Sequence, residues 1–190
     1  MSDTSDLEII KKVLSGDIES FSVIIDKYRG RIFNYTYSRV YNYDEALDMT
    51  QDIFLITMES LSSFRGESKF STWLYSIMVN YCKNYLKKRN RYSFVTIHKG
   101  EGADEFELPL PDKRQNHEQD IIDDDSLRIL KEELYRLPDD YRDILTLRDI
   151  EGLSYNEISS ILGINLSNVK VRIHRGRELL KKKLEERGLL

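Results

Sequence analysis

The chain has 190 residues, of which 40% are hydrophobic and 33% charged, and no apolar run approaches the roughly 18 residues that a membrane-spanning helix needs. This composition predicts one or two folded domains without direct membrane insertion, and the amino terminus lacks the pattern of a secretory signal, so the expected location is cytoplasmic. The single cysteine, Cys82, and the three scattered histidines have no metal-ligand spacing, so the sequence predicts no metal site and no cofactor.

The charges are distributed unevenly along the chain, although the net charge is only −4. Residues 83–99 carry six basic and no acidic side chains, and residues 164–190 carry eight basic and three acidic ones. Residues 100–125 carry ten acidic side chains and two basic ones. Two basic segments separated by an acidic one indicate two contacts with a polyanion, joined by a solvated tether. A solvated surface without any such contact is the alternative interpretation.

The amino-terminal part predicts a helical bundle, because no proline occurs before position 109 and apolar residues recur at helical spacing. Helices are expected at about 7–14, 18–40, 44–61 and 71–91. A turn is expected at Ser15-Gly16-Asp17, and a break in the second helix at Gly30. Residues 93–125 lose the helical pattern, carry the acidic run, and are too long for a loop within one domain. They predict a flexible acidic linker between domains at 1–92 and 126–190.

The carboxy-terminal part is helical in pattern again. Helices are expected at 126–136, from Pro138 onward, at about 154–162 and from Ser167 onward. Pro138 suits a first helical turn, where its missing N–H costs little. Ser154 and Glu157 have the spacing of a capping box, and Gly163 allows a sharp turn before the basic helix. A short helix, a turn and a basic helix form the helix-turn-helix pattern, so the expected fold class is all-α with two small helical domains.

The basic helix has two distinct faces when it is projected at 100° per residue. Val169, Ile173, Gly176 and Leu180 share one side, which predicts packing against the preceding helix. The other side mixes cations with an apolar residue, a combination that can read guanine edges and a thymine methyl group in a major groove. The residues expected at DNA are Ser167, Asn168, Lys170, Val171, His174 and Arg175, with Arg172 and Arg177 flanking them in reach of phosphates. An ordinary amphipathic helix with a basic solvent face is the alternative.

The helix expected at 44–61 also has two faces. Its predicted core side consists of Ala46, Leu47, Met49, Thr50, Ile53, Phe54, Thr57, Met58 and Leu61. The other side carries acidic and amide groups around a single leucine, Leu55. A leucine among acids is either an ordinary exposed residue or a docking position for a basic partner surface. The surrounding polar residues are Asp48, Gln51, Asp52 and Glu59.

A loop that alternates aromatic and basic residues follows, from Phe64 to Trp73. The next helix is expected to bury Leu74, Met78, Tyr81 and Tyr85, and to expose Trp73, Asn80, Asn84 and Lys87 along another edge. Aromatic rings that stack on bases, together with cations that follow the backbone, are typical of sites for unpaired DNA. Core packing explains Tyr81 and Tyr85 equally well, but it does not explain the aromatic residues clustered around the glycine-containing loop.

Two blocks of sequence resemble the extracytoplasmic-function group of RNA polymerase sigma factors. The first block runs from Asp44 to Leu55 and continues through Phe64-Arg65-Gly66-Glu67-Ser68 and Phe70-Ser71-Thr72-Trp73-Leu74, and it is similar to sigma region 2. The second block contains Leu137-Pro138, Tyr141-Arg142 and Gly152-Leu153-Ser154-Tyr155-Asn156-Glu157-Ile158 before the basic helix, and it is similar to region 4. Together the blocks, in their order and spacing, cover nearly the whole chain.

The resemblance implies a factor that binds core RNA polymerase and directs recognition and opening of minus-35/minus-10 promoters, for a stress or envelope regulon. It implies no catalysis and no small-molecule substrate. An anti-sigma factor, often membrane-anchored in this family, is the other implied partner, and it would hold the chain at the membrane. The acidic linker is similar to the family segment that threads toward the polymerase active centre.

Carried over residue by residue, the resemblance assigns three surfaces. The polymerase clamp would contact Asp48, Gln51, Asp52 and Leu55. The minus-10 DNA would contact Phe64, Arg65, Lys69, Phe70, Ser71, Trp73, Asn80, Asn84 and Lys87, with a pocket for a flipped base formed by the loop and Asn80. The basic helix would read the minus-35 groove, where Val171 and His174 depart from the side chains of related factors.

Two other functions remain open on the residues alone. A free-standing helix-turn-helix repressor would bind duplex DNA by itself, and would need neither Leu55 among acids nor the aromatic loop. A nuclease would use carboxylates such as Asp123, Asp124 and Asp125 with a divalent ion. Three consecutive acids on a linker converge poorly on one metal ion, which disfavours the nuclease.

Overall fold

The computed structural model describes residues 3–97 and 125–189, and every regular element in these two ranges is helical. The contacts divide the chain into two units. The helices of the amino-terminal unit are α1 (Asp3–Leu14), α2 (Phe21–Val40), α3 (Tyr43–Ser60) and α4 (Phe70–Ile97). Those of the carboxy-terminal unit are α5 (Asp125–Tyr135), α6 (Asp139–Leu145), α7 (Tyr155–Leu162) and α8 (Leu166–Glu186). The prediction of an all-α fold with two helical domains is confirmed.

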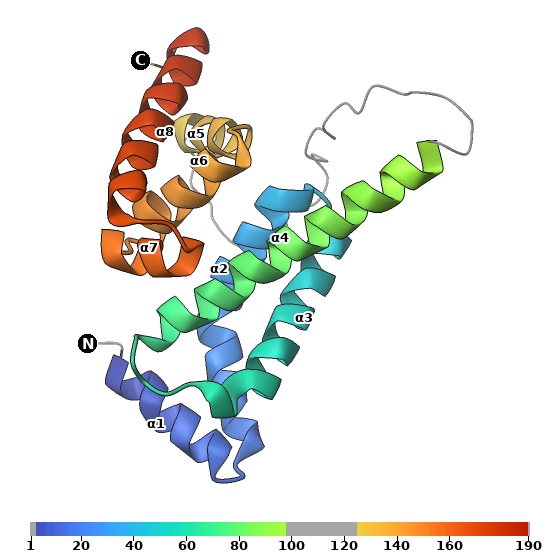
Figure 1. Cartoon of the computed structure of the whole chain (residues 1–190), viewed down its shortest axis with the longest axis vertical. Helices are drawn as coiled ribbons and strands as arrows, with labels where there is room; N and C mark the ends of the chain where they lie inside the picture. Colours follow the sequence, from blue (N-terminus) through green and yellow to red (C-terminus); the bar gives the residue numbers. More distant parts are fainter. Residues whose placement is uncertain (1–2, 98–124, 190) are drawn as a thin grey trace. The chain divides into compact units, whose positions relative to one another are not determined.

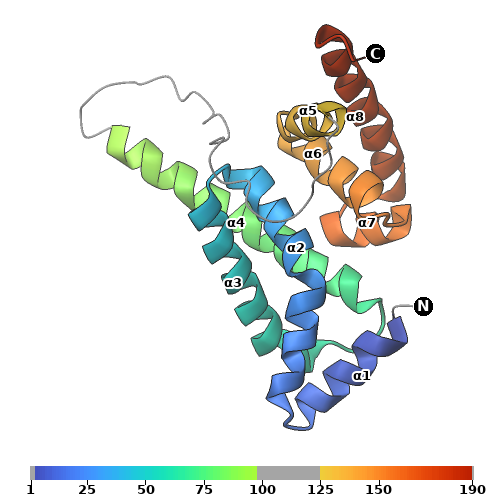
Figure 2. The ribbon, with the colours of Figure 1, turned by 180° about the vertical axis from the view of Figure 1, so that it is seen from behind.

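The amino-terminal unit is built on α2, α3 and α4, with α1 packed against the start of α2 (Figures 1 and 2). Each of the three longer helices contributes fully buried side chains to a common core: Ile24, Ile32, Ala46, Ile53, Leu74 and Val79. A buried polar link joins α2 to α3, because the Thr36 hydroxyl donates to the Ala46 carbonyl at 3.1 Å. Burial of one face of α3 and α4 leaves their opposite faces for other contacts.

Two sequence expectations about this unit were wrong. The second helix does not break at Gly30, because α2 continues without interruption from Phe21 to Val40. A glycine inside a helix costs only about 1 kcal/mol relative to alanine, and the buried Tyr28 and Ile32 hold both sides of Gly30 against the core. The fourth helix extends to Ile97 rather than ending near Arg91, so part of the expected linker is helical.

A buried carboxylate fixes α1 to α2. The side chain of Asp6 is almost fully buried, accepts a hydrogen bond from the Tyr28 hydroxyl at 2.7 Å, and pairs with Lys27. Burial, reinforced by the hydrogen bond to Asp6, raises the pKa of Tyr28. The same tyrosine packs edge-on against Phe70, with ring centroids 5.9 Å apart. This contact holds the start of α4 and the loop before it on the core.

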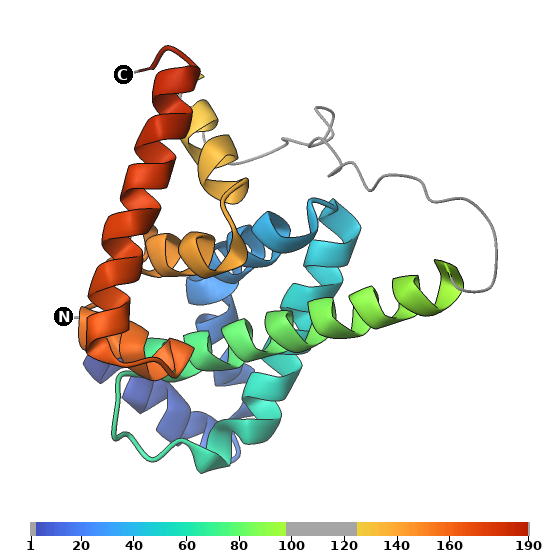
Figure 3. The ribbon, with the colours of Figure 1, turned by 45° about the horizontal axis from the view of Figure 1, so that its top comes forward.

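In the carboxy-terminal unit, α8 packs against α5, α6 and α7 (Figure 3). The core is formed by Ile144, Leu145, Leu147, Ile158, Val169 and Ile173. Glu133 of α5 is buried and forms ion pairs with Arg136 at 2.7 Å and with Arg187 at 2.8 Å. This carboxylate connects the end of α8 to α5. Of the predicted core face of α8, Val169, Ile173 and Gly176 are buried and Leu180 is half-buried.

Gly176 sets the closest approach between α8 and α6. A Cβ atom built on Gly176 would lie 3.2 Å from Cγ of Leu145, whereas one built on Gly30 would meet no heavy atom within 4 Å. Gly176→Val is expected to destabilise the carboxy-terminal unit by about 1–3 kcal/mol through overpacking. Native-state hydrogen exchange of the α6 and α8 amides measures the loss. Gly30→Val, the matched control, should leave the α2 amides nearly unchanged, and equal effects at both glycines would contradict the packing argument.

Candidate functional site

The exposed face of α3 carries all four residues predicted to bind polymerase. Asp48, Gln51 and Asp52 are exposed, and Leu55 is 62% exposed between them. Leu47 was predicted to be core, and this was wrong: it is 39% exposed, at the edge of a buried arc that is narrower than expected. At 100° per residue, Gln51 lies about 40° and Leu47 about 80° around α3 from Leu55, so Leu47 stands at the edge of the exposed face.

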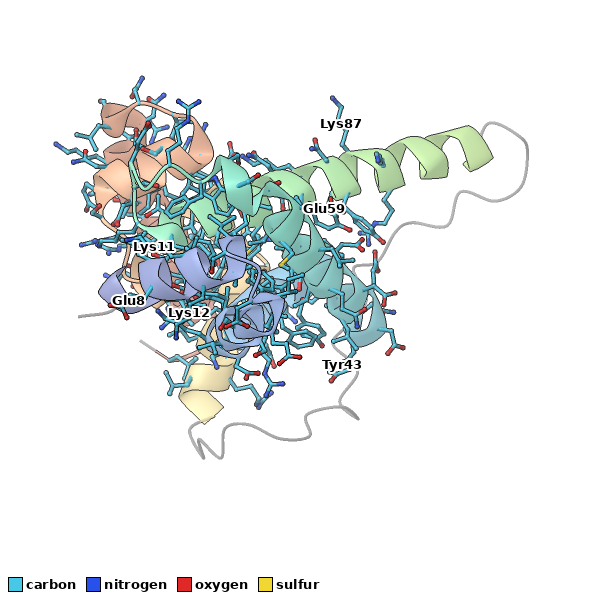
Figure 4. All side chains as sticks on the ribbon, turned by 90° about the horizontal axis from the view of Figure 1, so that it is seen from below. Glu8, Lys11, Lys12, Tyr43, Glu59 and Lys87 are labelled. Atoms are coloured by element: carbon cyan, nitrogen blue, oxygen red, sulfur yellow. The ribbon has the colours of Figure 1, made fainter. Side chains whose placement is uncertain are left out.

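Tyr43 is the first residue of α3 and lies twelve residues before Leu55, which places it about 120° around the helix from Leu55. It is exposed, lies at the outer end of the helix (Figure 4), and packs edge-on against Phe33 with ring centroids 5.2 Å apart. Helical projection of the sequence did not single out Tyr43, and it placed Leu47 in the core. The available signal for Leu47 was its place at the border of the projected apolar arc.

Two tyrosines of α4 orient acids of α3. The Tyr81 hydroxyl donates to Oδ2 of Asp52 at 2.5 Å, and Nη1 of Arg89 donates to Oε1 of Glu45 at 3.0 Å. Tyr85 stacks on Tyr81 with ring centroids 6.1 Å apart, and it hydrogen-bonds to Glu45. Burial, followed by these hydrogen bonds, raises the pKa of both tyrosines. They were predicted to be buried, but both are only half-buried, because their hydroxyls reach the surface acids.

The aromatic loop forms a triangle of rings at the start of α4. The ring centroids of Phe64 and Trp73 lie 5.3 Å apart, and Phe70 lies 5.5 Å from Phe64 and 5.7 Å from Trp73. Phe70 is only 1% exposed, so the predicted contact of its ring with DNA is wrong. Its ring instead packs against those of Phe64 and Trp73. Phe64 and Trp73 are partly exposed, and Arg65 and Lys69 are exposed beside them.

The α4 helix continues this surface with polar side chains. Asn80, Asn84 and Lys87 are exposed, and at 100° per residue they fall on the side of α4 that carries Trp73. Figure 4 shows Lys87 projecting from α4 away from the bundle. Ser71 is half-buried and falls on nearly the opposite side of the helix from Trp73, so the structure does not bring it into this row.

The helix-turn-helix is fixed by local hydrogen bonds. Ser154 and Glu157 form the predicted capping box, with the Ser154 N–H donating to the Glu157 carboxylate at 2.8 Å. Gly163 ends α7 at φ +65°, a left-handed conformation that suits glycine, as predicted for the sharp turn. The Asn165 side chain caps α8 by accepting from the N–H of Asn168 at 2.8 Å. These caps define the start of the basic helix.

The structure places the predicted DNA face of α8 on the outside of the unit. Its exposed members are Ser167, Asn168, Lys170, Val171, His174 and Arg175. Asn168, Val171 and Arg175 also line a shallow depression with Pro138, Asp140 and Tyr141. Nδ1 of His174 lies 3.3 Å from Oε2 of Glu178 on the next turn. Cationic, polar and apolar groups are therefore side by side, as direct readout of base edges requires.

The two flanking arginines are paired with acids in the free chain. Nη1 of Arg172 lies 3.2 Å from Oδ2 of Asp140. Arg177 binds Asp149 through two nitrogens, Nη2 at 2.5 Å and Nε at 3.2 Å, and this hydrogen bonding raises the pKa of its guanidinium. Sequence reasoning missed both acids, because they lie 28 or more residues before their partners.

Other kinds of site find little support in the described residues. Within residues 3–97 and 125–189, no group of three histidine, cysteine or acidic side chains could hold a metal ion. Asp123 and Asp124, considered for a nuclease, lie outside those ranges. Over the same part of the chain, no helix combines the length and the apolar character needed to cross a membrane.

Each of the two units is similar in sequence to a known protein family. Residues 24–92 match the sigma-70 region 2 family and residues 127–180 match the sigma-70 region 4 family. The RNA polymerase sigma-H factor of Pseudomonas aeruginosa is 33% identical over 181 residues, which cover 95% of this chain and 94% of the relative. The ECF RNA polymerase sigma factor SigW of Bacillus subtilis is 34% identical over 179 residues, covering 93% of this chain and 95% of SigW.

Two solved structures share the fold. CnrH, solved in complex with the cytosolic domain of CnrY, has a TM-score of 0.65 at 19% identity, covering 94% of this chain and 96% of CnrH. The sigma factor RpoE of Bartonella quintana, solved with the anti-sigma factor NepR, has a TM-score of 0.63 at 23% identity, covering 88% of this chain and 98% of RpoE. With both sigma regions in order, and with relatives more than 30% identical along nearly its whole length, the chain belongs to the extracytoplasmic-function (ECF) group of RNA polymerase sigma factors.

Proposed function

We propose that this ECF sigma factor binds core RNA polymerase through α3 and promoter DNA through two separate surfaces, one in each unit. As a sigma factor it is a transcription initiation factor, and transcript synthesis belongs to the polymerase. The observation that carries the proposal is the presence of three exposed faces of different chemistry, each on a helix whose other side is buried. A free-standing repressor has no use for the first two of these faces, and family membership does not support it.

The polymerase surface consists of Leu47 and Leu55 with Asp48, Gln51 and Asp52. Two exposed leucines among acids suit a partner surface that combines apolar side chains with cations. The hydrogen bond from Tyr81 holds the Asp52 carboxylate in one orientation before binding. A side chain oriented in advance loses less conformational entropy on association.

The minus-10 surface consists of the partly exposed rings of Phe64 and Trp73, the cations Arg65, Lys69 and Lys87, and the amides of Asn80 and Asn84. A ring that stacks on an unpaired base contributes about 1–3 kcal/mol. The amides can hydrogen-bond to base edges, and the cations can follow the phosphates. We assign this surface to the melted non-template strand, where unstacked bases are available.

The minus-35 surface is the outer face of α8, centred on Lys170, Val171, His174 and Arg175. Its capped start and buried Val169 and Ile173 hold the helix rigidly on the unit. A rigid helix that presents these side chains fits a major groove. We therefore assign sequence readout of the duplex to this helix.

We further infer an anti-sigma partner that covers one or more of these faces, in the cytoplasm where polymerase acts. The inference is supported by two solved structures of the same fold: CnrH, solved with the cytosolic domain of CnrY, and the sigma factor RpoE, solved with the anti-sigma factor NepR. Exposed leucines on α3 are the kind of surface that such a protein would bury. A membrane-anchored partner would hold the chain at the membrane.

Runoff transcription tests the proposal. Purified protein with core polymerase on genomic fragments is expected to give discrete transcripts that core alone does not produce. The absence of any such transcript, together with tight binding of the free protein to a duplex, would support the repressor instead. Omission of core from the same reactions controls for contaminating polymerase.

A further inference from the structure

The recognition helix carries two arginines outside its groove face, one on each flank. At 100° per residue, Arg172 falls on one side of the row formed by Ser167, Val171 and His174, and Arg177 falls on the other. These are the positions from which long cations reach the phosphates on the two sides of a groove. Both guanidiniums are nevertheless engaged within the chain.

Their acidic partners come from a different segment, which packs against α8. Asp140 lies in the first turn of α6, and Asp149 lies in the π-helical turn Thr146–Ile150 that follows α6. Leu145 and Leu147, in the same segment, are fully buried, so its backbone is fixed relative to α8. The two carboxylates are therefore held beside the flanks of the groove face.

The pairs contribute little to folding, because all four charged groups are exposed or partly exposed. Pairs of this kind contribute about 0–1 kcal/mol to stability. Their effect on DNA binding is different in kind. A carboxylate that lies against an arginine removes a positive charge from the backbone contact, and it also adds a negative charge that repels phosphate.

We propose that Asp140 and Asp149 are specificity-determining residues, which withhold Arg172 and Arg177 from phosphates and so lower the affinity for DNA of any sequence. The proposal rests on the assignment of α8 to the minus-35 groove. Phosphate contacts add affinity without sequence information, whereas base contacts discriminate. With both flanking cations neutralised, Lys170 and Arg175 on the groove face carry a larger share of the binding free energy.

The test is the salt dependence of binding to a mixed-sequence duplex, measured with the full chain by fluorescence anisotropy. Asp149→Asn nearly preserves the size of the side chain and replaces the carboxylate that neutralises Arg177 with an uncharged amide. It is expected to raise the affinity at low salt, and to steepen the slope of log K against log salt by about 0.9, the value for one added phosphate contact. Between about 50 and 200 mM salt the gain over the parent should then shrink about 3.5-fold.

A double variant tests whether Asp149→Asn changes the salt dependence through Arg177 or through a general change in net charge. If Asp149 acts through Arg177, Asp149→Asn in an Arg177→Ala background should leave the slope unchanged. Glu185→Gln is the matched control, because Glu185 pairs with Lys181 at 3.6 Å and lies ten residues beyond Arg175, about 15 Å further along α8. It should not alter the slope either.

Two outcomes overturn the inference: an unchanged slope in Asp149→Asn, or a steeper slope that persists without Arg177. In either case Arg175→Ala decides the fate of the proposed function. If Arg175→Ala weakens duplex binding while Asp149→Asn leaves the slope unchanged, the inference about Asp149 fails and the assignment of α8 to DNA stands. If neither variant alters duplex binding, α8 is not the DNA surface, and the proposed function fails with the inference.

Discussion

Leu55→Asp is expected to reduce the affinity for core RNA polymerase by roughly thirtyfold or more, the effect of losing about 2 kcal/mol at a central interface anchor. Leu55 is 62% exposed and makes no core contact that the fold needs. The circular dichroism spectrum and the melting temperature should therefore stay close to those of the parent. Asp48→Arg should have a similar effect, because it reverses a charge on the same face. Fluorescence anisotropy with labelled protein and core polymerase measures both.

Ile18→Asp is the matched control for Leu55→Asp. Ile18 is 63% exposed in the turn between α1 and α2. Like Leu55→Asp, this substitution places an aspartate where an apolar side chain meets solvent. Its affinity for core should be unchanged. An equal loss in both variants would mean that a general property of the unit was damaged. Unchanged binding by Leu55→Asp and Asp48→Arg would refute the assignment of the α3 face.

Arg175→Ala and Asn80→Ala are expected to block initiation at different steps. Arg175 lies on the groove face of α8, so its removal should weaken the closed complex by about 1–3 kcal/mol if it makes a bidentate base contact. Asn80 lies on the α4 row beside the aromatic loop, so its removal should spare duplex engagement and impair opening. Permanganate footprinting of unpaired thymines in the holoenzyme complex measures opening directly.

A template that is already melted across the minus-10 region separates the two defects further. Transcription by Asn80→Ala should recover on this template if melting is the lost step, whereas Arg175→Ala should not recover. Asn34→Ala, on the exposed side of α2, is the control for Asn80→Ala because it removes the same type of side chain. Lys181→Ala is the control for Arg175→Ala because it removes another cation from α8. Equal opening by Asn80→Ala and the parent protein would refute the pocket. A selective opening defect in Arg175→Ala would mean that the roles of the two units are exchanged.

Most of the candidate site follows from patterns within single helices. The acids around Leu55, the row of Trp73, Asn80, Asn84 and Lys87, and the outer face of α8 were all predicted by helical projection. Projection works for these residues because one helix turns through a fixed angle per residue. It fails where exposure depends on a neighbouring element. Phe70 is buried because Tyr28, which is 42 positions earlier in the chain, covers it from α2.

The sequence by itself determined where α7 begins and ends and where α8 begins, because the responsible groups are close in the chain. The capping box of Ser154 and Glu157 and the left-handed Gly163 act over at most a few residues. The two sigma blocks are also local strings, so the family was readable before the fold. Local hydrogen bonds and backbone conformations need no knowledge of distant partners.

Only the tertiary structure decided which side chains on those helices are free. Leu47 is exposed because the other helices cover a narrower arc of α3 than its apolar residues suggested. The α2 helix continues through Gly30 because the residues on either side of it are buried. Arg177 is held by Asp149 from a segment 28 positions away. Burial and ion pairing are set by contacts between elements distant in sequence, and the periodicity of one helix carries no information about what packs against it.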